Sequence, residues 1–324
     1  MIVIRDPRDL QDTLRGACIT IGNFDGVHVG HQLLIARTRE KARARGLESV
    51  VLTFEPHPER VLVGPDTPPF ITLLDQKLEL IGAQGVEVAV VMEFTRELAA
   101  VSPEEFVRLY LVECLNCREL VIGYDYAFGK GRKGNYELLA ALGAQHGFGV
   151  ERLGPVMLDG AVVSSTRIRD LVQAGKVWEA MPLLGRFYIV QGEVVHGRDR
   201  GGKLLGFPTA NLKLVDELFP ATGVYAVWAE LDGRIHPAVA NIGYNPTFGN
   251  TALSVEAHLL DYSGDLYGRA VRIHFVQRLR SEQKFSGLDE LKARIAQDIQ
   301  LGRQILSSSL AQCYQPHLEQ PLHQ

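Results

Sequence analysis

Two histidines, His28 and His31, lie three residues apart in the stretch GNFDGVHVGHQ, which spans residues 22–32. Three-residue spacing on a helical turn points both imidazole rings the same way. Two imidazoles over a phosphate can donate hydrogen bonds and, when charged, stabilise the negative charge that develops as the phosphorus is attacked. The pair therefore indicates electrophilic assistance at a phosphate; the alternative is a polar turn with two surface histidines.

The glycines of the same stretch indicate that a ligand approaches its backbone. Gly22, Gly26 and Gly30 leave room where a Cβ would collide with a nucleotide. The longer segment ITIGNFDGVHVGHQLLIARTRE is typical of a strand, a glycine loop and a helix in succession. Ligands of open α/β sheets bind where a strand ends and a helix begins, because the free backbone N–H groups there attract anions.

A second strand-to-helix junction, VVSSTRIRDLVQAG at residues 162–175, offers hydroxyls and positive charge. Ser164, Ser165 and Thr166 stand beside Arg167 and Arg169. Ser and Thr at a helix start are commonly only caps. Two arginines beside three hydroxyls make a better triphosphate clamp than a cap requires.

A third segment, GEVVHGRDRGGKLLGFPTANLKL, concentrates five glycines, two arginines and a lysine between residues 192 and 206. Successive free N–H groups of such a loop can enclose phosphates as an anion nest. The spacing differs from that of the Walker A phosphate loop. A long loop with solvated charges is the alternative.

Oxygen ligands and a carboxylate follow this loop. Thr209 and Asn211 lie two apart, on one side of an extended chain, and their neutral oxygens together with ATP phosphates and water suit Mg²⁺. Glu256 lies among apolar residues in the strand-like segment LSVEAHLLDY. A carboxylate that points into a barrel is costly unless it has a function, whereas one on the outer face is unremarkable.

The first half of the chain must position the two histidines. Between residues 17 and 153, helical patterns alternate with apolar runs of strand length, namely ACITIG, SVVLTF, VEVAVVM, ELVIG and FGVERLG. This alternation predicts βαβ units and therefore a doubly wound parallel sheet. RDLVQAGKVWEAMPLLG predicts two short helices broken at Gly175, which end the first domain at residue 184.

The second half predicts a different architecture. Strand-like segments follow one another without a helical segment between them: RFYIVQGEVVHG, GVYAVWAEL, IHPAVANIG, LSVEAHLLDY and RAVRIHFVQRLR. They predict an antiparallel barrel or sandwich, and GLDELKARIAQDIQLGRQIL predicts a helix packed on it by one face. We therefore expect domains at 1–184 and 185–308, followed by a polar tail at 309–324.

The charge and composition of the chain indicate which kinds of molecule it can bind. A formal net charge of −4 gives no global positive field for a nucleic acid or a membrane surface. The charged N-terminal stretch and the lack of a long apolar run favour a cytoplasmic protein. The stretch CLNC at 114–117 invites a metal or redox interpretation, but no second Cys or His pair follows at zinc spacing, so we expect ordinary buried thiols.

The segments GNFDGVHVGH and SSTRIR resemble the HxGH-type nucleotidyltransferases, and specifically the bacterial bifunctional riboflavin kinase/FMN adenylyltransferase (FAD synthetase) family. LTFEPHPE and VIGYDYAFGKGRKGN are similar to that family's loops after the second and fourth strands, while GFPTAN, NIGYNPTF and VEAHLLD are similar to its riboflavin kinase module. The resemblance extends from about residue 15 to residue 305. It implies an α/β plus all-β protein: a Rossmann-like nucleotidyltransferase domain, then an antiparallel β-barrel kinase domain with a terminal helix.

The resemblance also implies roles for particular residues. The catalytic residues would be His28, His31 and Arg167 in adenylyl transfer from ATP to FMN, and Glu256 as the base that deprotonates the ribityl 5′-hydroxyl of riboflavin. Nucleotide and phosphate contacts would come from Gly22, Asn23, Phe24, Gly26, Gly30, Ser164, Ser165, Thr166, Gly197, Lys203 and Gly206. Mg²⁺ would bind Thr209 and Asn211, and flavin would contact His57, Asp125 and Arg280.

Two alternatives remain open at this point. The first is a single-activity riboflavin kinase with an impaired nucleotidyltransferase domain, since the family more often has Phe where this chain has Tyr126, with Ala127 beside it. The second is a flavin-binding carrier or regulator, which would not need the catalytic side chains that this chain retains. For His57, the alternative to flavin contact is a Pro-flanked turn. The expected partners are riboflavin, FMN and ATP, with no nucleic acid and no membrane.

Overall fold

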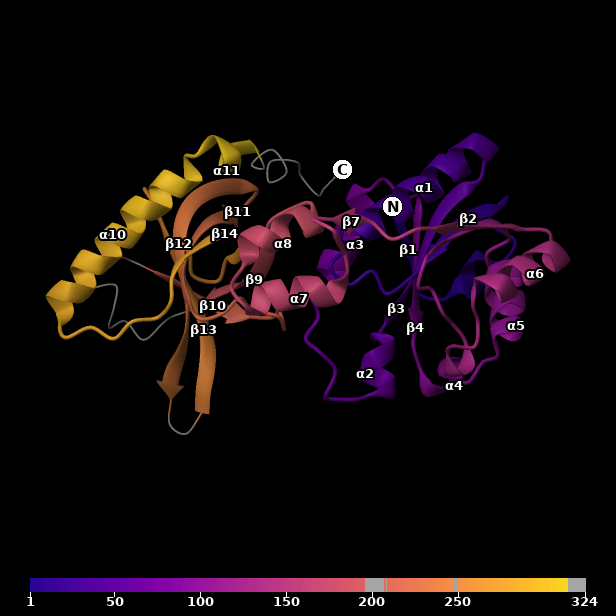
Figure 1. Ribbon diagram of the computed structural model, residues 1–324, viewed down its shortest axis with the longest axis horizontal. Coiled ribbons are helices and arrows are strands. Elements are labelled where there is room, and N and C mark those ends of the chain that lie inside the picture. The colour runs from indigo at the N-terminus through magenta and orange to yellow at the C-terminus, as the bar shows by residue number, and fades with distance from the viewer. Residues whose placement is uncertain (196–206, 208, 248–249, 314–324) are drawn as a thin grey trace. The chain divides into compact units, whose positions relative to one another are not determined.

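The computed structural model describes residues 1–195, 207, 209–247 and 250–313, in two compact units (Figure 1). The first unit is Met1–Ser164 and the second is Ser165–Gln324. The expected phosphate contacts Gly197, Lys203 and Gly206 lie outside the described residues.

A six-stranded parallel sheet forms the centre of the first unit. Its spatial order is β1 (Ile2–Ile4), β4 (Val88–Glu93), β3 (Glu48–Glu55), β2 (Ala17–Ile21), β5 (Cys117–Gly123) and β6 (Gly149–Leu153). Every neighbouring pair is parallel. All five residues of β2 are buried, as expected for a central strand of a parallel sheet covered on both faces.

Helices connect these strands. They are α1 (Val29–Arg45), α2 (Pro58–Leu62), α3 (Leu74–Ala83), α4 (Arg96–Ala99), α5 (Pro103–Phe106) and α6 (Tyr136–His146). Short 3₁₀ turns lie at Pro7–Leu10 and Lys130–Arg132, and a π-helical segment, Val107–Cys114, continues α5. A hairpin of β7 (Met157–Leu158) and β8 (Ala161–Val162) ends the unit.

The second unit begins with α7 (Ser165–Gln173) and α8 (Val177–Leu184), which are separated at Gly175. A closed antiparallel barrel follows, in the order β10 (Ala210–Leu214), β13 (Asn250–Leu259), β12 (Arg234–Thr247), β11 (Gly223–Leu231), β14 (Ala270–Arg280) and β9 (Tyr188–Val195). The long helix α10 (Leu288–Leu306) packs on β11, β12 and β14, as Figure 1 shows, and α11 (Ser309–Cys313) follows it.

The fold class is confirmed, and the structure decides for a barrel over a sandwich. Each predicted strand is present, β8 among them at the start of the predicted strand-to-helix junction, whereas β1, β7 and β10 were not predicted. The prediction of a polar tail was wrong for residues 309–313, because α11 forms there and Ala311 is buried in an apolar cluster with Leu306 and Phe187.

The division between the units falls before α7. α8 packs on β9 and β14, and its Met181 joins the cluster that contains Trp228 and Val276. By packing, residues 165–184 thus belong with the barrel. The boundary predicted at residue 184 followed the motifs rather than the packing, and it stays a prediction about where the nucleotidyltransferase part ends.

The cysteines follow their expected role. Cys18, Cys114 and Cys117 are buried and carry free thiols. Burial raises the pKa of the Cys18 thiol to about 11, so this thiol is protonated at neutral pH. Among the described residues, no group of three or more His, Cys, Asp or Glu side chains could hold a metal ion.

Candidate functional site

The loops after β2, β3 and β5 meet at one edge of the parallel sheet. β2 lies between β3 and β5. From β2 the chain adds β3 and β4 on one side, and then β5 and β6 on the other. In open α/β sheets, ligands bind outside the carboxyl ends of the strands at such a reversal of strand order. The segment that carries the two histidines therefore lies where the fold forms a binding crevice.

His28 is the residue that caps α1. Its Nδ1 accepts a hydrogen bond from the His31 backbone N–H at 3.3 Å. The two imidazole rings stack, with centroids 3.6 Å apart and an angle of 16° between their planes. Gly30 makes this possible, because a Cβ on it would lie 3.1 Å from Cε1 of His28. The predicted side-by-side arrangement of the two rings is confirmed.

The electrostatic environment keeps His31 neutral. Burial, together with the nearby His28 and Lys77, lowers the pKa of His31 well below its usual value. Among the described residues, the buried Nδ1 of His31 has no hydrogen-bond partner. A buried polar atom of this kind is one that a ligand can satisfy.

Lys77 of α3 is a residue that the sequence analysis missed. It is buried, and burial lowers its pKa, while the charges of Glu55 and Asp25 act in the opposite direction. The only signal in the sequence is a lysine within the otherwise amphipathic pattern LDQKLELIGA. Its interaction with His31 depends on the packing of α3, which is not readable from local spacing.

Asp25 fixes the loop between β2 and α1. Its carboxylate accepts hydrogen bonds from the backbone N–H groups of Ile71 at 3.0 Å and Thr72 at 3.1 Å. The N–H of Gly26 donates to the hydroxyl of Thr72 at 3.0 Å. Phe24 is almost completely buried, with φ at +51°, so its side chain supports the loop from within. Any contact of Phe24 with a nucleotide would come from its backbone.

Two residues expected to contact flavin at this edge of the sheet, His57 and Asp125, differ in exposure. His57 follows β3 and caps α2, since its Nδ1 accepts from the Glu59 N–H at 3.2 Å, and its ring packs on Phe70 at 4.7 Å. These contacts favour a structural role for His57. Asp125 follows β5 and is exposed, as expected for a residue that meets a ligand.

The SSTRIR segment lies at the junction of the units. Ser164 ends the first unit, and Ser165, Thr166 and Arg167 open α7 in the second. The strand-to-helix transition predicted there is confirmed. The grip of these residues on the phosphates beside His28 stays a prediction.

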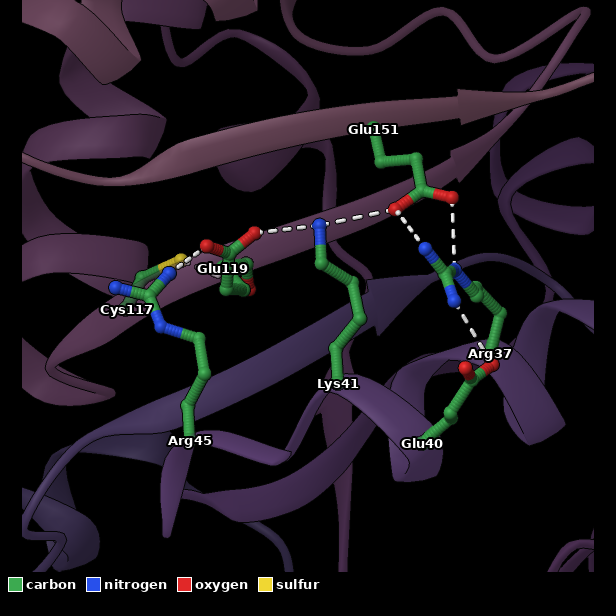
Figure 2. Close-up of polar contacts among 7 residues, drawn as sticks. All are labelled: Arg37, Glu40, Lys41, Arg45, Cys117, Glu119 and Glu151. Carbon is green, nitrogen blue, oxygen red and sulfur yellow. Dashed lines mark hydrogen bonds and ion pairs between the residues drawn. The ribbon is translucent and has the colours of Figure 1, made fainter. Parts of the chain in front are cut away.

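An ion-pair network fastens α1 to the sheet (Figure 2). Lys41 lies between two carboxylates, 2.7 Å from Glu119 on β5 and 2.9 Å from Glu151 on β6. Arg37 binds Glu151 at 2.8 Å, and Arg45 pairs with Glu119. Because α1 begins at the histidines, this network fixes the helix that presents them. Sequence spacing alone does not reveal it, since the partners come from distant strands.

In the barrel, two amides flank the expected base. Asn211 of β10 lies directly opposite Glu256 of β13, and Asn241 of β12 lies opposite Glu256 on the other side. Cross-strand partners share one face of a sheet, with Cβ atoms about 4.5–5.5 Å apart. We call Asn211, Glu256 and Asn241 the polar row.

The polar row lies on the outer face of the barrel. Its three members are partly exposed. Their neighbours along each strand are buried: Ala210, Leu212, Ala240, Ile242, Val255 and Ala257. Because side chains alternate between faces, the buried set fills the interior and the row faces outward. Glu256 is thus accessible to a substrate.

Thr209 and Arg280 are the other described barrel residues with an expected role, in binding Mg²⁺ and flavin respectively. Thr209 directly precedes β10 and is exposed. Arg280 ends β14, and its guanidinium binds Asp298 of α10 through two nitrogens, at 2.9 Å and 2.8 Å. This pairing gives Arg280 a structural role, whereas its expected contact with flavin stays a prediction.

Comparison with known families identifies both halves. A family model for FAD synthetase matches residues 10–167, and one for riboflavin kinase matches residues 184–306. The fold and the two sites thus define a protein that joins a nucleotidyltransferase unit to a kinase barrel. Among the described residues, no helix has the length and apolar character needed to cross a membrane.

The chain resembles curated proteins over nearly its whole length. It is 41% identical to the bifunctional riboflavin kinase/FMN adenylyltransferase of Pseudomonas fluorescens, over 95% of this chain and 99% of that one. It is 38% identical to the Escherichia coli K12 protein of the same description, over 92% and 96% of the two chains. A solved structure described as a macrolide-efflux protein from Streptococcus pneumoniae aligns with a TM-score of 0.84 and 32% identity, covering 93% of this chain and 98% of that chain. The chain belongs to the bifunctional riboflavin kinase/FMN adenylyltransferase family.

Proposed function

We propose that the two activities of this family, which produce FMN and FAD, divide between the two described sites. The barrel phosphorylates riboflavin to FMN with ATP, and the parallel-sheet unit transfers AMP from ATP to FMN. The observation that carries this division is the arrangement of the polar row, which holds a carboxylate between two amides on an accessible face of the barrel. The assay below separates this division from the two alternatives, a single-activity riboflavin kinase and a flavin-binding carrier or regulator.

In the kinase reaction, Glu256 acts as general base. Its carboxylate takes the proton of the ribityl 5′-hydroxyl as the oxygen bonds to the γ-phosphorus, and the bond to the β-phosphate oxygen breaks to release ADP. A positioned base of this kind contributes a factor of about 10² to 10⁴ in rate. The outward orientation of Glu256 supports this role because the carboxylate is within reach of a substrate.

In the adenylyl transfer, an oxygen of the FMN phosphate bonds to the α-phosphorus of ATP and pyrophosphate leaves. His28 and His31 donate hydrogen bonds to the charge that develops on the phosphate oxygens. Nδ1 of His28 accepts the capping hydrogen bond, so Nε2 is the nitrogen that can donate to a phosphate oxygen. Ser164, Ser165, Thr166 and Arg167 hold the departing pyrophosphate.

Mg²⁺ fits the residues at the polar row. The amide oxygen of Asn211 and the hydroxyl of Thr209 are hard, neutral ligands, and Mg²⁺ commonly takes only one or two protein ligands beside substrate phosphates and water. When bound, the ion neutralises polyphosphate charge. Thr209 and Asn211 would hold the ion, and the Glu256 carboxylate would stay available for the proton.

The experiment that tests the division supplies purified protein with ATP, Mg²⁺ and either riboflavin or FMN, and separates the flavins by chromatography. FAD from both starting flavins supports two working sites. Accumulation of FMN without FAD supports the single-activity kinase, and unchanged flavin in both reactions supports the carrier.

A further inference from the structure

A second carboxylate reaches the polar row from the segment that follows the barrel. Gly243 lies two residues beyond Asn241 on β12 and therefore faces the same side. A Cβ on Gly243 would lie 2.5 Å from Oε1 of Glu282 and 3.3 Å from Nδ2 of Asn241. The carboxylate of Glu282 thus rests against β12 beside the Asn241 amide, in space that only a residue without a side chain leaves free.

Both ends of the segment that carries Glu282 are attached to α10. Before it, Arg280 binds Asp298. After it, the backbone N–H and the hydroxyl of Ser286 donate to Glu290 at 2.8 Å and 2.6 Å. Because the intervening chain is short, these anchors place Glu282 over the strand that carries Asn241.

We propose that Asn241 is a positioning residue for Glu256 and that Glu282 orients the Asn241 amide. A side-chain amide has two N–H donors, so Asn241 can donate one to the Glu256 carboxylate opposite it and one to Glu282 beside it. The chain Glu282–Asn241–Glu256 then holds the base in the orientation that receives the proton. This inference rests on the proposed function of Glu256 as the kinase base, and it assigns no contact with substrate to Asn241 or Glu282.

Three single substitutions interrupt this chain at different points. Asn241→Ala removes the amide, and Glu282→Ala removes the second carboxylate. Gly243→Ala keeps both, but its methyl occupies the space of the flexible Glu282 carboxylate, and the backbone of Gly243 is not in the left-handed region. Each should lower kcat for FMN formation about ten- to a hundredfold, with the KM values for riboflavin and ATP unchanged, because misplacing a catalytic group slows chemistry more than binding.

The matched control is Gln283→Ala, which changes the exposed residue next to Glu282 and should leave kcat unchanged. FAD formation from FMN in the same samples should also be unchanged, since that reaction takes place in the other unit. The double variant Gly243→Ala/Glu282→Ala should be no slower than either single variant, because both remove the same interaction.

Unchanged kcat in all three variants, losses that appear in KM instead, or an additive double variant would each overturn the inference. Glu256→Gln separates this failure from that of the proposed function. If Glu256→Gln keeps kinase activity, Glu256 is not the base. If Glu256→Gln stops the kinase while Asn241→Ala, Glu282→Ala and Gly243→Ala remain fast, only the positioning chain is wrong.

Discussion

Asn211 and Glu256 are direct cross-strand partners between β10 and β13, although 44 positions separate them in the sequence. This register places an amide oxygen, a ligand of the kind Mg²⁺ accepts, beside the carboxylate that we propose as the base. Substrate phosphate and the base must lie within a few ångströms of each other for transfer to occur. The pairing therefore supports the proposal that the barrel has one compact reaction site.

Replacing Asn211 by Ala should raise the Mg²⁺ concentration that half-saturates the kinase reaction, because one oxygen ligand is lost. Titrating Mg²⁺ in assays of FMN formation and of FAD formation measures both requirements in one protein. Only the kinase requirement should change. A kinase requirement equal to that of the unsubstituted protein would contradict the assignment of Asn211 as a metal ligand.

Replacing Asp25 should impair FAD formation and leave FMN formation unchanged. Asp25→Ala leaves two buried N–H groups without their carboxylate acceptor, at a cost of about 1–3 kcal/mol for each group left unsatisfied. The loop that carries His28 should loosen, which raises the KM for ATP in FAD formation. The milder Thr72→Val removes only the hydroxyl that accepts from Gly26 and should give a smaller effect. An unchanged midpoint of urea unfolding for Asp25→Ala would refute this role.

The ion-pair network of α1 should contribute measurably to stability. Glu119→Gln removes a nearly buried partner of Lys41 and Arg45, and we expect a loss of about 2 kcal/mol, between the values typical of exposed and buried pairs. Glu40→Gln is the matched control, because Glu40 makes an exposed pair with Arg37 and its loss should change stability little. Urea unfolding followed by circular dichroism compares the two. Equal losses of stability in the two variants would show that burial does not determine how much each ion pair contributes.

His31 should make the first unit sensitive to acid. Its pKa in the folded protein is lowered, so the unfolded chain takes up the proton first as the pH falls through the ordinary value of 6.5. The stability that the neutral ring contributes is therefore present above about pH 6.5 and is lost progressively below it. Histidine NMR signals should show His31 still neutral at pH 6, and His31→Gln should reduce the acid sensitivity. A His31 signal that titrates near 6.5 would contradict this account.

Local sequence patterns predicted most of the strands and helices but not which strands pair with one another. Apolar runs and glycine loops predicted the strands of the sheet, because burial on both faces leaves a continuous apolar signal. β1 was missed since only three residues, Ile2–Ile4, pair with β4. β10 gives a weak strand signal, because it has only five residues and follows a glycine-rich stretch.

The candidate sites were predictable where chemistry and spacing coincide. His28 and His31 are close in sequence, so the turn of one helix brings their rings together. Lys77, Asn241 and Glu282 gave no such signal, because their positions depend on helix packing, strand register and the absence of a side chain at Gly243. These contacts join residues that are distant in the sequence, so the local patterns of a single sequence do not reveal them.

The measurement that tests the central claim most directly compares two variants in the flavin assay. Glu256→Gln is incubated with riboflavin or FMN, and His28→Ala is treated in the same way, each with ATP and Mg²⁺. We expect Glu256→Gln to make no FMN from riboflavin yet to convert FMN to FAD. His28→Ala should make FMN from riboflavin but no FAD. Loss of both activities in either folded variant would contradict the assignment of one reaction to each site.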